Sequence, residues 1–160
     1  MEATKLLEKQ HDEAIRLGLR LAAAFDPVAR RELFVELADV FSAHMMSEER
    51  LFYPAIDSEE GRERLEALLD EHRAIKRLIA ELLEHEPAEE RFEVLRKLLQ
   101  EKIDLHVERE EAEVFPGVRQ QFTRDDLEAL GEELENLYYE LRQGAPRYEV
   151  PAQLEETPLP

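Results

Sequence analysis

A short motif occurs twice in the chain, with its two copies 62 positions apart. The copies run from His44 to Pro54 and from His106 to Pro116. In each copy the histidine is followed four and five positions later by two glutamates, and an aromatic residue directly precedes the proline. A lone histidine lies about 33 residues ahead of each copy, at His11 and His72, and these two are 61 positions apart. The chain is therefore a tandem duplication of one unit.

Apolar residues recur every three or four positions through four successive segments, a spacing typical of helices that bury one face. The repeated histidines all lie on these apolar stripes, and counting residues to the helix ends places the four in one layer of a bundle. The predicted fold is all-α, an antiparallel up-down four-helix bundle made of two repeated hairpins. We predict its helices over about residues 2–25, 27–52, 62–86 and 88–116.

The chain continues beyond the second copy of the motif. We expect residues 1–122 to form the bundle, residues 123–143 to form an additional C-terminal helix, and residues 144–160 to form an irregular tail with little apolar content. Leucines spaced by three and four residues from Leu127 to Leu141 form an apolar seam. That seam must pack either on the bundle or on a second copy of the chain, giving a homodimer.

The composition excludes several classes of partner. A net charge of −18 argues against nucleic-acid partners and anionic membranes, which require a basic face. The sequence has neither an apolar run of about 20 residues nor an apolar signal region at its start, so we expect a cytoplasmic protein. Because the chain has no cysteine, any bound metal must be held by nitrogen and oxygen, which suits iron, manganese or zinc.

A histidine and a glutamate four residues apart on a helix are about 40° apart around its axis, so both can bind the same ion. A single histidine on an apolar face is more often a hydrogen-bonded structural residue, but here four share one layer with two glutamates. An ionised glutamate in an apolar layer costs several kcal/mol unless it is paired or binds a metal. No lysine or arginine on the apolar stripes could neutralise both glutamates, although Lys76, one turn beyond His72, could reach one of them. We therefore predict a metal site, and no separate catalytic residues, formed by His11, His44, Glu48, His72, His106 and Glu110.

The order of residues distinguishes two kinds of metal bundle. Ferritin-like carboxylate sites use Glu-x-x-His with the acid first, whereas the histidine leads in both copies here. The doubled motif with its upstream histidines resembles the haemerythrin-like, or HHE cation-binding, family over about residues 7–116. The resemblance implies two iron ions, bridged by two carboxylates and an oxo or hydroxo group, which meet O₂, NO or peroxide. By position, it implies the same six ligands.

One position departs from the family's oxygen carriers, which have a second histidine one turn after the first on the third helix. Here that position is Lys76. The loss of a nitrogen ligand weakens the case for O₂ carriage and favours a protein that binds or senses O₂, NO, peroxide or iron. A peroxide-decomposing enzyme and a metal-free interaction bundle are the alternatives. Glu111 has the carriers' ligand spacing from His106, so the choice between it and Glu110 stays open.

Overall fold

The structure is a computed structural model and describes residues 1–150. Within these residues it is all-helical with no strand, which confirms the all-α part of the predicted fold class. No helix in the described part has an apolar stretch long enough to cross a membrane. The long helices are α1 (Ala3–Ala23), α2 (Pro27–Ser47), α4 (Arg62–Leu82), α5 (Glu90–Arg109) and α7 (Arg124–Gln143), and two short ones are α3 (Tyr53–Ile56) and α6 (Phe115–Gln121).

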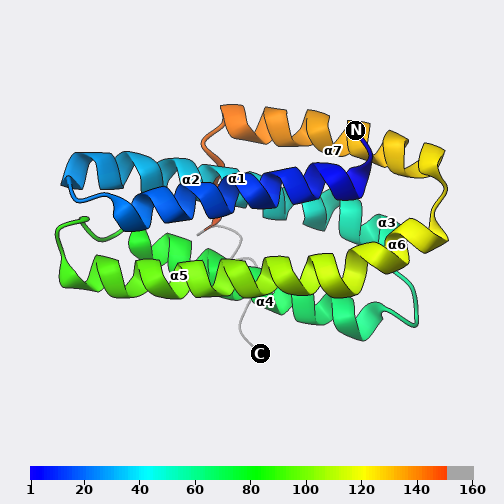
Figure 1. The fold of residues 1–160 in the computed structure, drawn as a ribbon, viewed down its shortest axis with the longest axis horizontal. Coiled ribbons are helices and arrows are strands. Elements are labelled where there is room, and N and C mark those ends of the chain that lie inside the picture. The colour runs from blue at the N-terminus through cyan, green and yellow to red at the C-terminus, as the bar shows by residue number, and fades with distance from the viewer. Residues whose placement is uncertain (151–160) are drawn as a thin grey trace.

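The long helices pair as two hairpins. Helices α1 and α2 pack along each other, as do α4 and α5, and Figure 1 shows the second hairpin lying against the first. Each hairpin corresponds to one copy of the sequence repeat. The turn between α1 and α2 ends at Asp26, whose carboxylate accepts a hydrogen bond from the Ala29 N–H, and Pro27 then occupies the first helical position.

The second and fourth predicted helices contain a feature that their periodicity does not reveal. Each widens into a π-helical turn, η1 (Glu48–Phe52) after α2 and η2 (Glu110–Val114) after α5. The Tyr53 N–H donates to the Glu48 carbonyl, five residues back, and the Phe115 N–H donates to the Glu110 carbonyl in the same way. Short π-helical turns of this kind are frequent at functional sites. Both begin at a predicted ligand.

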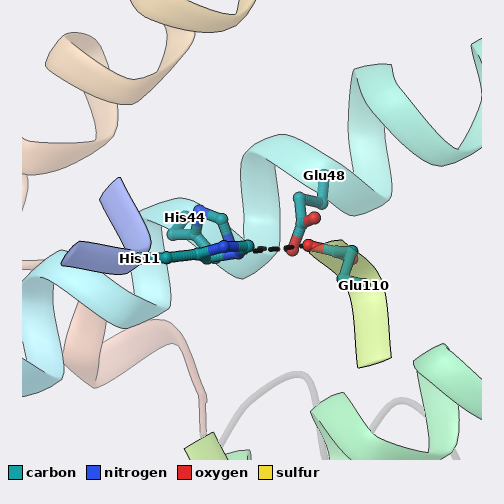
Figure 2. Close-up of side chains that lie close together, drawn as sticks. All are labelled: His11, His44, Glu48 and Glu110. Atoms are coloured by element: carbon teal, nitrogen blue, oxygen red, sulfur yellow. Dashed lines mark hydrogen bonds and ion pairs between the residues drawn. The ribbon is translucent and has the colours of Figure 1, made fainter. Parts of the chain in front are cut away.

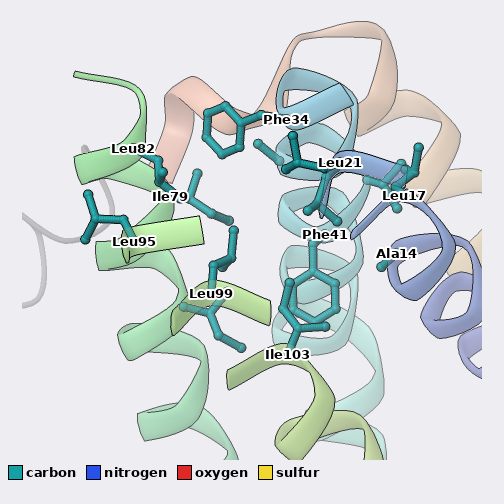
Figure 3. Close-up of a cluster of buried hydrophobic side chains, with 14 of the residues drawn as sticks. Ala14, Leu17, Leu21, Phe34, Phe41, Ile79, Leu82, Leu95, Leu99 and Ile103 are labelled. Atoms are coloured by element: carbon teal, nitrogen blue, oxygen red, sulfur yellow. The ribbon is translucent and has the colours of Figure 1, made fainter. Parts of the chain in front are cut away.

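The two largest of three apolar clusters in the described part of the chain fill most of the interior. The larger one, drawn in Figure 3, includes Leu21, Phe34, Phe41 and Leu99, and all four long helices of the hairpins contribute to it. The second cluster includes Leu7, Phe52, Leu68 and Phe115. His11 on α1 and His72 on α4 lie in sequence between residues of the second cluster and residues of the larger one, and Glu48 and Glu110 lie between residues of the larger cluster and residues of the second. The site is therefore a polar layer with apolar packing on either side.

Helix α7 lies along α1 and α2, which decides where its leucine seam packs within this chain. Leu134 is fully buried there, and Gly131 permits the close contact, because a Cβ at that position would lie 2.1 Å from the Met1 carbonyl oxygen. A homodimer through this helix stays an untested prediction.

The start of the predicted irregular tail is ordered. Residues Pro146–Tyr148 form a short 3₁₀ helix, η3, and Arg147 donates from its backbone N–H and its guanidinium to the Asp39 carboxylate on α2. The sequence reading missed this anchor because its acceptor lies more than one hundred residues away in the chain. The rest of the predicted tail, residues 151–160, lies outside the described residues.

Candidate metal centre

The six predicted ligands meet in one buried layer, and none of them is exposed to solvent. Figure 2 shows four of them, His11, His44, Glu48 and Glu110, pointing toward one another from α1, α2 and the starts of the two π-helical turns. Their ligand atoms lie within 4.8 Å of one another. A second group of the same kind consists of Glu48, His72 and His106, so the two groups share a carboxylate.

Both carboxylates lie between the two hairpins' histidines. Glu48 Oε1 is 2.9 Å from His44 Nε2 and 3.3 Å from His72 Nε2. Glu110 Oε1 is 3.1 Å from His11 Nε2, and its Oε2 is 3.6 Å from His106 Nε2. Each glutamate therefore faces histidines from both hairpins.

The outer nitrogen of every imidazole has a partner. With Nδ1–H donating outward, each ring presents the Nε2 lone pair to the layer, which is the tautomer that binds a metal. Each Nδ1–H donates to a side-chain oxygen, and the nitrogen–oxygen distances are 3.0 Å from His11 to Glu111, 2.8 Å from His44 to Gln10, 2.9 Å from His72 to Glu49 and 2.8 Å from His106 to Glu71.

These outer acceptors are sequence neighbours of the ligands. Gln10 directly precedes His11 and Glu111 directly follows Glu110, and their counterparts in the other copy of the repeat are Glu71 and Glu49. The structure distinguishes Glu110 from Glu111, a choice that the sequence left open. Glu110 faces the layer, whereas Glu111 supports His11 from outside with a side chain that is 35% exposed.

Tyr53 is a site residue that sequence reasoning missed. Its buried hydroxyl donates to Glu110 Oε2 at 2.7 Å and lies 3.2 Å from His72 Nε2. On a regular α-helix, the fifth residue after Glu48 would point about 140° away from it. The π-helical turn returns Tyr53 to the same side. The aromatic residue before each repeated proline was the available signal, and its second copy, Phe115, stacks on the His11 ring.

The sequence allowed Lys76 to pair with one of the predicted ligand carboxylates, but in the structure Lys76 pairs with neither of them. Its ammonium donates to Glu49 Oε1 at 2.7 Å, and Glu49 in turn accepts from His72. Among the described residues, no lysine or arginine forms an ion pair with Glu48 or Glu110. The layer therefore has no built-in cation to balance its carboxylates.

The unpaired atoms test whether a metal fits. Both oxygens of Glu48 and Oε1 of Glu110 are buried without a hydrogen-bond partner. The inner nitrogens of His11 and His44 are only 3.1 Å apart, as are those of His72 and His106 at 3.2 Å. Lone pairs that face one another at these distances require a proton or a cation between them. Nitrogen and carboxylate oxygen are ligands that suit iron, manganese and zinc, so the residues fit a metal pair.

When no metal is bound, protons supply part of the positive charge that the facing lone pairs require. Burial lowers the pKa of His11, but the Glu110 and Glu111 carboxylates outweigh burial and raise that pKa to about 9. Burial is likewise outweighed at His106, where Glu110, Glu48 and Glu71 raise the pKa to about 10. Burial lowers the pKa of His44 to about 4, which leaves that ring neutral. The metal-free layer therefore carries protons on His11 and His106 at pH 7.

We expect metal binding at pH 7 to release protons, because His11 and His106 must lose theirs before Nε2 can bind an ion. Since both pKa values lie above 7, the apparent affinity should rise with pH by about tenfold per pH unit for each proton displaced, until the pH passes about 9 for His11 and about 10 for His106. Calorimetric titrations with Zn²⁺ in buffers of different ionisation enthalpy measure the release. Binding heats that do not depend on the buffer would contradict this prediction.

Three comparisons place the chain among known proteins. Residues 2–118 match the family described as hemerythrin HHE cation binding domain. A solved structure with the same fold is that of an HHE cation binding domain-containing protein, the Rv2633c homolog from Mycobacterium kansasii, with a TM-score of 0.81, 24% identity and coverage of 96% of this chain and 94% of that one. A Nostoc protein named DNA nickase is 25% identical over 128 residues, and the match covers 80% of this chain but only 36% of that protein.

Proposed function

Because the chain belongs to the hemerythrin HHE cation-binding domain family, we propose that its buried layer holds two iron ions and that the protein binds or senses O₂, NO or peroxide there. One observation carries the proposal: two carboxylates and four imidazoles lie fully buried together, with carboxylate oxygens that have no hydrogen-bond partner. Removing ionised groups from water is unfavourable unless cations compensate for it. A pair of bound cations compensates all six groups at once.

The proposal assigns each residue a task. His11 and His44 would hold one ion together with Glu48 and Glu110, and His72 and His106 would hold the other together with Glu48. Iron supplies the capacity to bind a small ligand and to exchange electrons with it. The chain excludes bulk water from the layer and fixes each ring through its outer acceptor. Tyr53 adds a hydroxyl beside His72 and donates a hydrogen bond from it to Glu110.

The proposed architecture is the antiparallel four-helix bundle of α1, α2, α4 and α5, with α7 as an added helix. Two features support it: the close packing within each hairpin, and the contribution of all four helices to one apolar cluster. Because each helix contributes one or two ligands at the same depth, the bundle positions the metal pair without any loop residue.

The absorption spectrum of the aerobically purified protein tests the proposal. We expect a pair of iron ions per chain and near-ultraviolet bands that change when azide or peroxide is added. A zinc pair with the same ligands has no such bands, so the spectrum separates the two metals. Metal analysis that finds less than one transition-metal ion per chain would refute the proposal.

Tyr53 favours a second candidate, the decomposition of peroxide, in which two H₂O₂ yield O₂ and two H₂O. Its phenol is buried within hydrogen-bond distance of Glu110, and burial together with that carboxylate raises the pKa of Tyr53, so the phenol keeps its proton and can donate it. Steady O₂ evolution from added peroxide would support this candidate. Stoichiometric bleaching of the iron would leave binding or sensing as the function.

The other expected partners stay predictions. The Nostoc relative's name refers to DNA, but the match covers only part of that protein, and a net charge of −18 opposes DNA binding by this chain. We retain a small diatomic molecule or peroxide as the expected ligand, with no nucleic acid or membrane.

A further inference from the structure

The two halves of the metal centre have different outer partners, although the repeat makes their ligands equivalent. We call His11 and His44 the first pair, and His72 and His106 the second pair. The residue that accepts from His44 is the neutral Gln10, whereas its repeat counterpart, which accepts from His106, is the acidic Glu71. The two copies of the repeat therefore differ at a residue that accepts a hydrogen bond from a predicted metal ligand.

The second pair is held by two anchored carboxylates. Glu71 accepts from His106 Nδ1 with one oxygen and from the Arg109 guanidinium with the other. Glu49 accepts from His72 Nδ1 with one oxygen and from the Lys76 ammonium with the other. Each carboxylate is therefore fixed between a ligand and a cation.

The first pair lacks both cations. The repeat counterparts of Lys76 and Arg109 are Ile15 and Ser47, which carry no charge. Glu111, the carboxylate that supports His11, is 35% exposed and forms no ion pair with a lysine or arginine among residues 1–150. The first pair thus relies on one neutral acceptor and one unanchored carboxylate.

Outer partners of this kind tune metal affinity. A carboxylate that accepts from the Nδ1–H of a ligating imidazole raises the basicity of its Nε2 and fixes the plane of the ring. A cation on the far side of the carboxylate holds that geometry before the metal arrives, so less conformational entropy is lost on binding. Both effects favour the second pair over the first.

We infer that the two pairs bind metal unequally, that the second pair takes up the first ion, and that Glu71 is the positioning residue that sets most of the difference. The inference rests on the proposed function only in that the layer must bind metal. It depends neither on which metal the cell supplies nor on the ligand that the metal meets.

Reciprocal exchange of the two outer residues tests the inference. Anaerobic calorimetric titration of the metal-free protein with Co²⁺ should show two steps of unequal affinity. Glu71→Gln should weaken the tighter step by about 10- to 100-fold, until it approaches the weaker one. Gln10→Glu should strengthen the weaker step and leave the tighter one unchanged. Glu128→Gln, which alters a surface carboxylate paired with Arg124, should change neither step.

Each other outcome counts against the inference in a distinct way. Two equal steps in the unmodified chain, or equal weakening of both steps by Glu71→Gln, would overturn it while leaving the proposed function standing. No uptake of Co²⁺ at all would overturn both. Because Gln10 is buried, its change to glutamate risks disturbing the fold. Glu71→Gln keeps the side-chain shape at a partly exposed position, so the decisive variant does not depend on that risk.

Discussion

Stripping the metal from the loaded protein is expected to lower its melting temperature by about 8–16 °C. Metal at one thousand times its dissociation constant adds about 4 kcal/mol to the free energy of unfolding, and about 2–4 °C accompanies each kcal/mol in a chain of this size. The local cause is the buried carboxylate of Glu48, whose two oxygens have no hydrogen-bond partner when no metal is bound. Calorimetric melting curves before and after chelation measure the change.

A variant that should lose most of its metal provides the control for this experiment. In His44→Ala/His106→Ala, each pair of imidazoles keeps only one member, so chelator should leave the melting temperature unchanged. Equal melting temperatures for the loaded and stripped forms of the unmodified chain would contradict the prediction. In that case the layer would be stabilised by protons on His11 and His106 alone, as a metal-free bundle requires.

The same double variant should lose most of its metal. His44 and His106 are fully buried, and each shares the layer with a carboxylate one helical turn away. Loss of a residue that merely supports a ligand lowers affinity by about 10- to 100-fold, so loss of the ligand itself should cost at least as much at each ion. Elemental analysis of dialysed protein, with circular dichroism to verify folding, measures the effect.

His85 offers a matched substitution of the same residue type. Its side chain is 26% exposed and its ring bonds to Glu89 at the protein surface, away from the layer. His85→Ala should therefore keep the full metal content. If the double variant retained as much metal as His85→Ala, the imidazoles in the layer would not be ligands, and the proposed function would fail with them.

The duplicated motif predicted much of this molecule. Helical periodicity indicated an all-helical chain, which the described residues confirm, and the family match confirms the resemblance drawn from His11, His72 and the two motif copies. The reason is that both signals are local. Apolar spacing depends on the pitch of one helix, and a histidine four residues before a glutamate shares its face wherever the helix is placed.

Local spacing could not predict contacts between residues of different hairpins. His11 bonds Glu111, one hundred positions away, and no spacing within one helix announces such a pair. The same limit explains why Lys76 was expected near a ligand and instead supports Glu49. Residues adjacent to ligands in the sequence point about 100° away from them on their own helix, and only the neighbouring helix shows what they meet.

The sequence by itself determined the long helices, the repeat and five of the six side chains that face inward. Only the tertiary structure decided that Tyr53 joins them, that Glu110 rather than Glu111 faces the layer, and that α7 packs on α1 and α2. The physical reason is that the first set follows from regular backbone geometry. The second set depends on a π-helical turn and on which buried groups remain unpaired once separate helices have packed together.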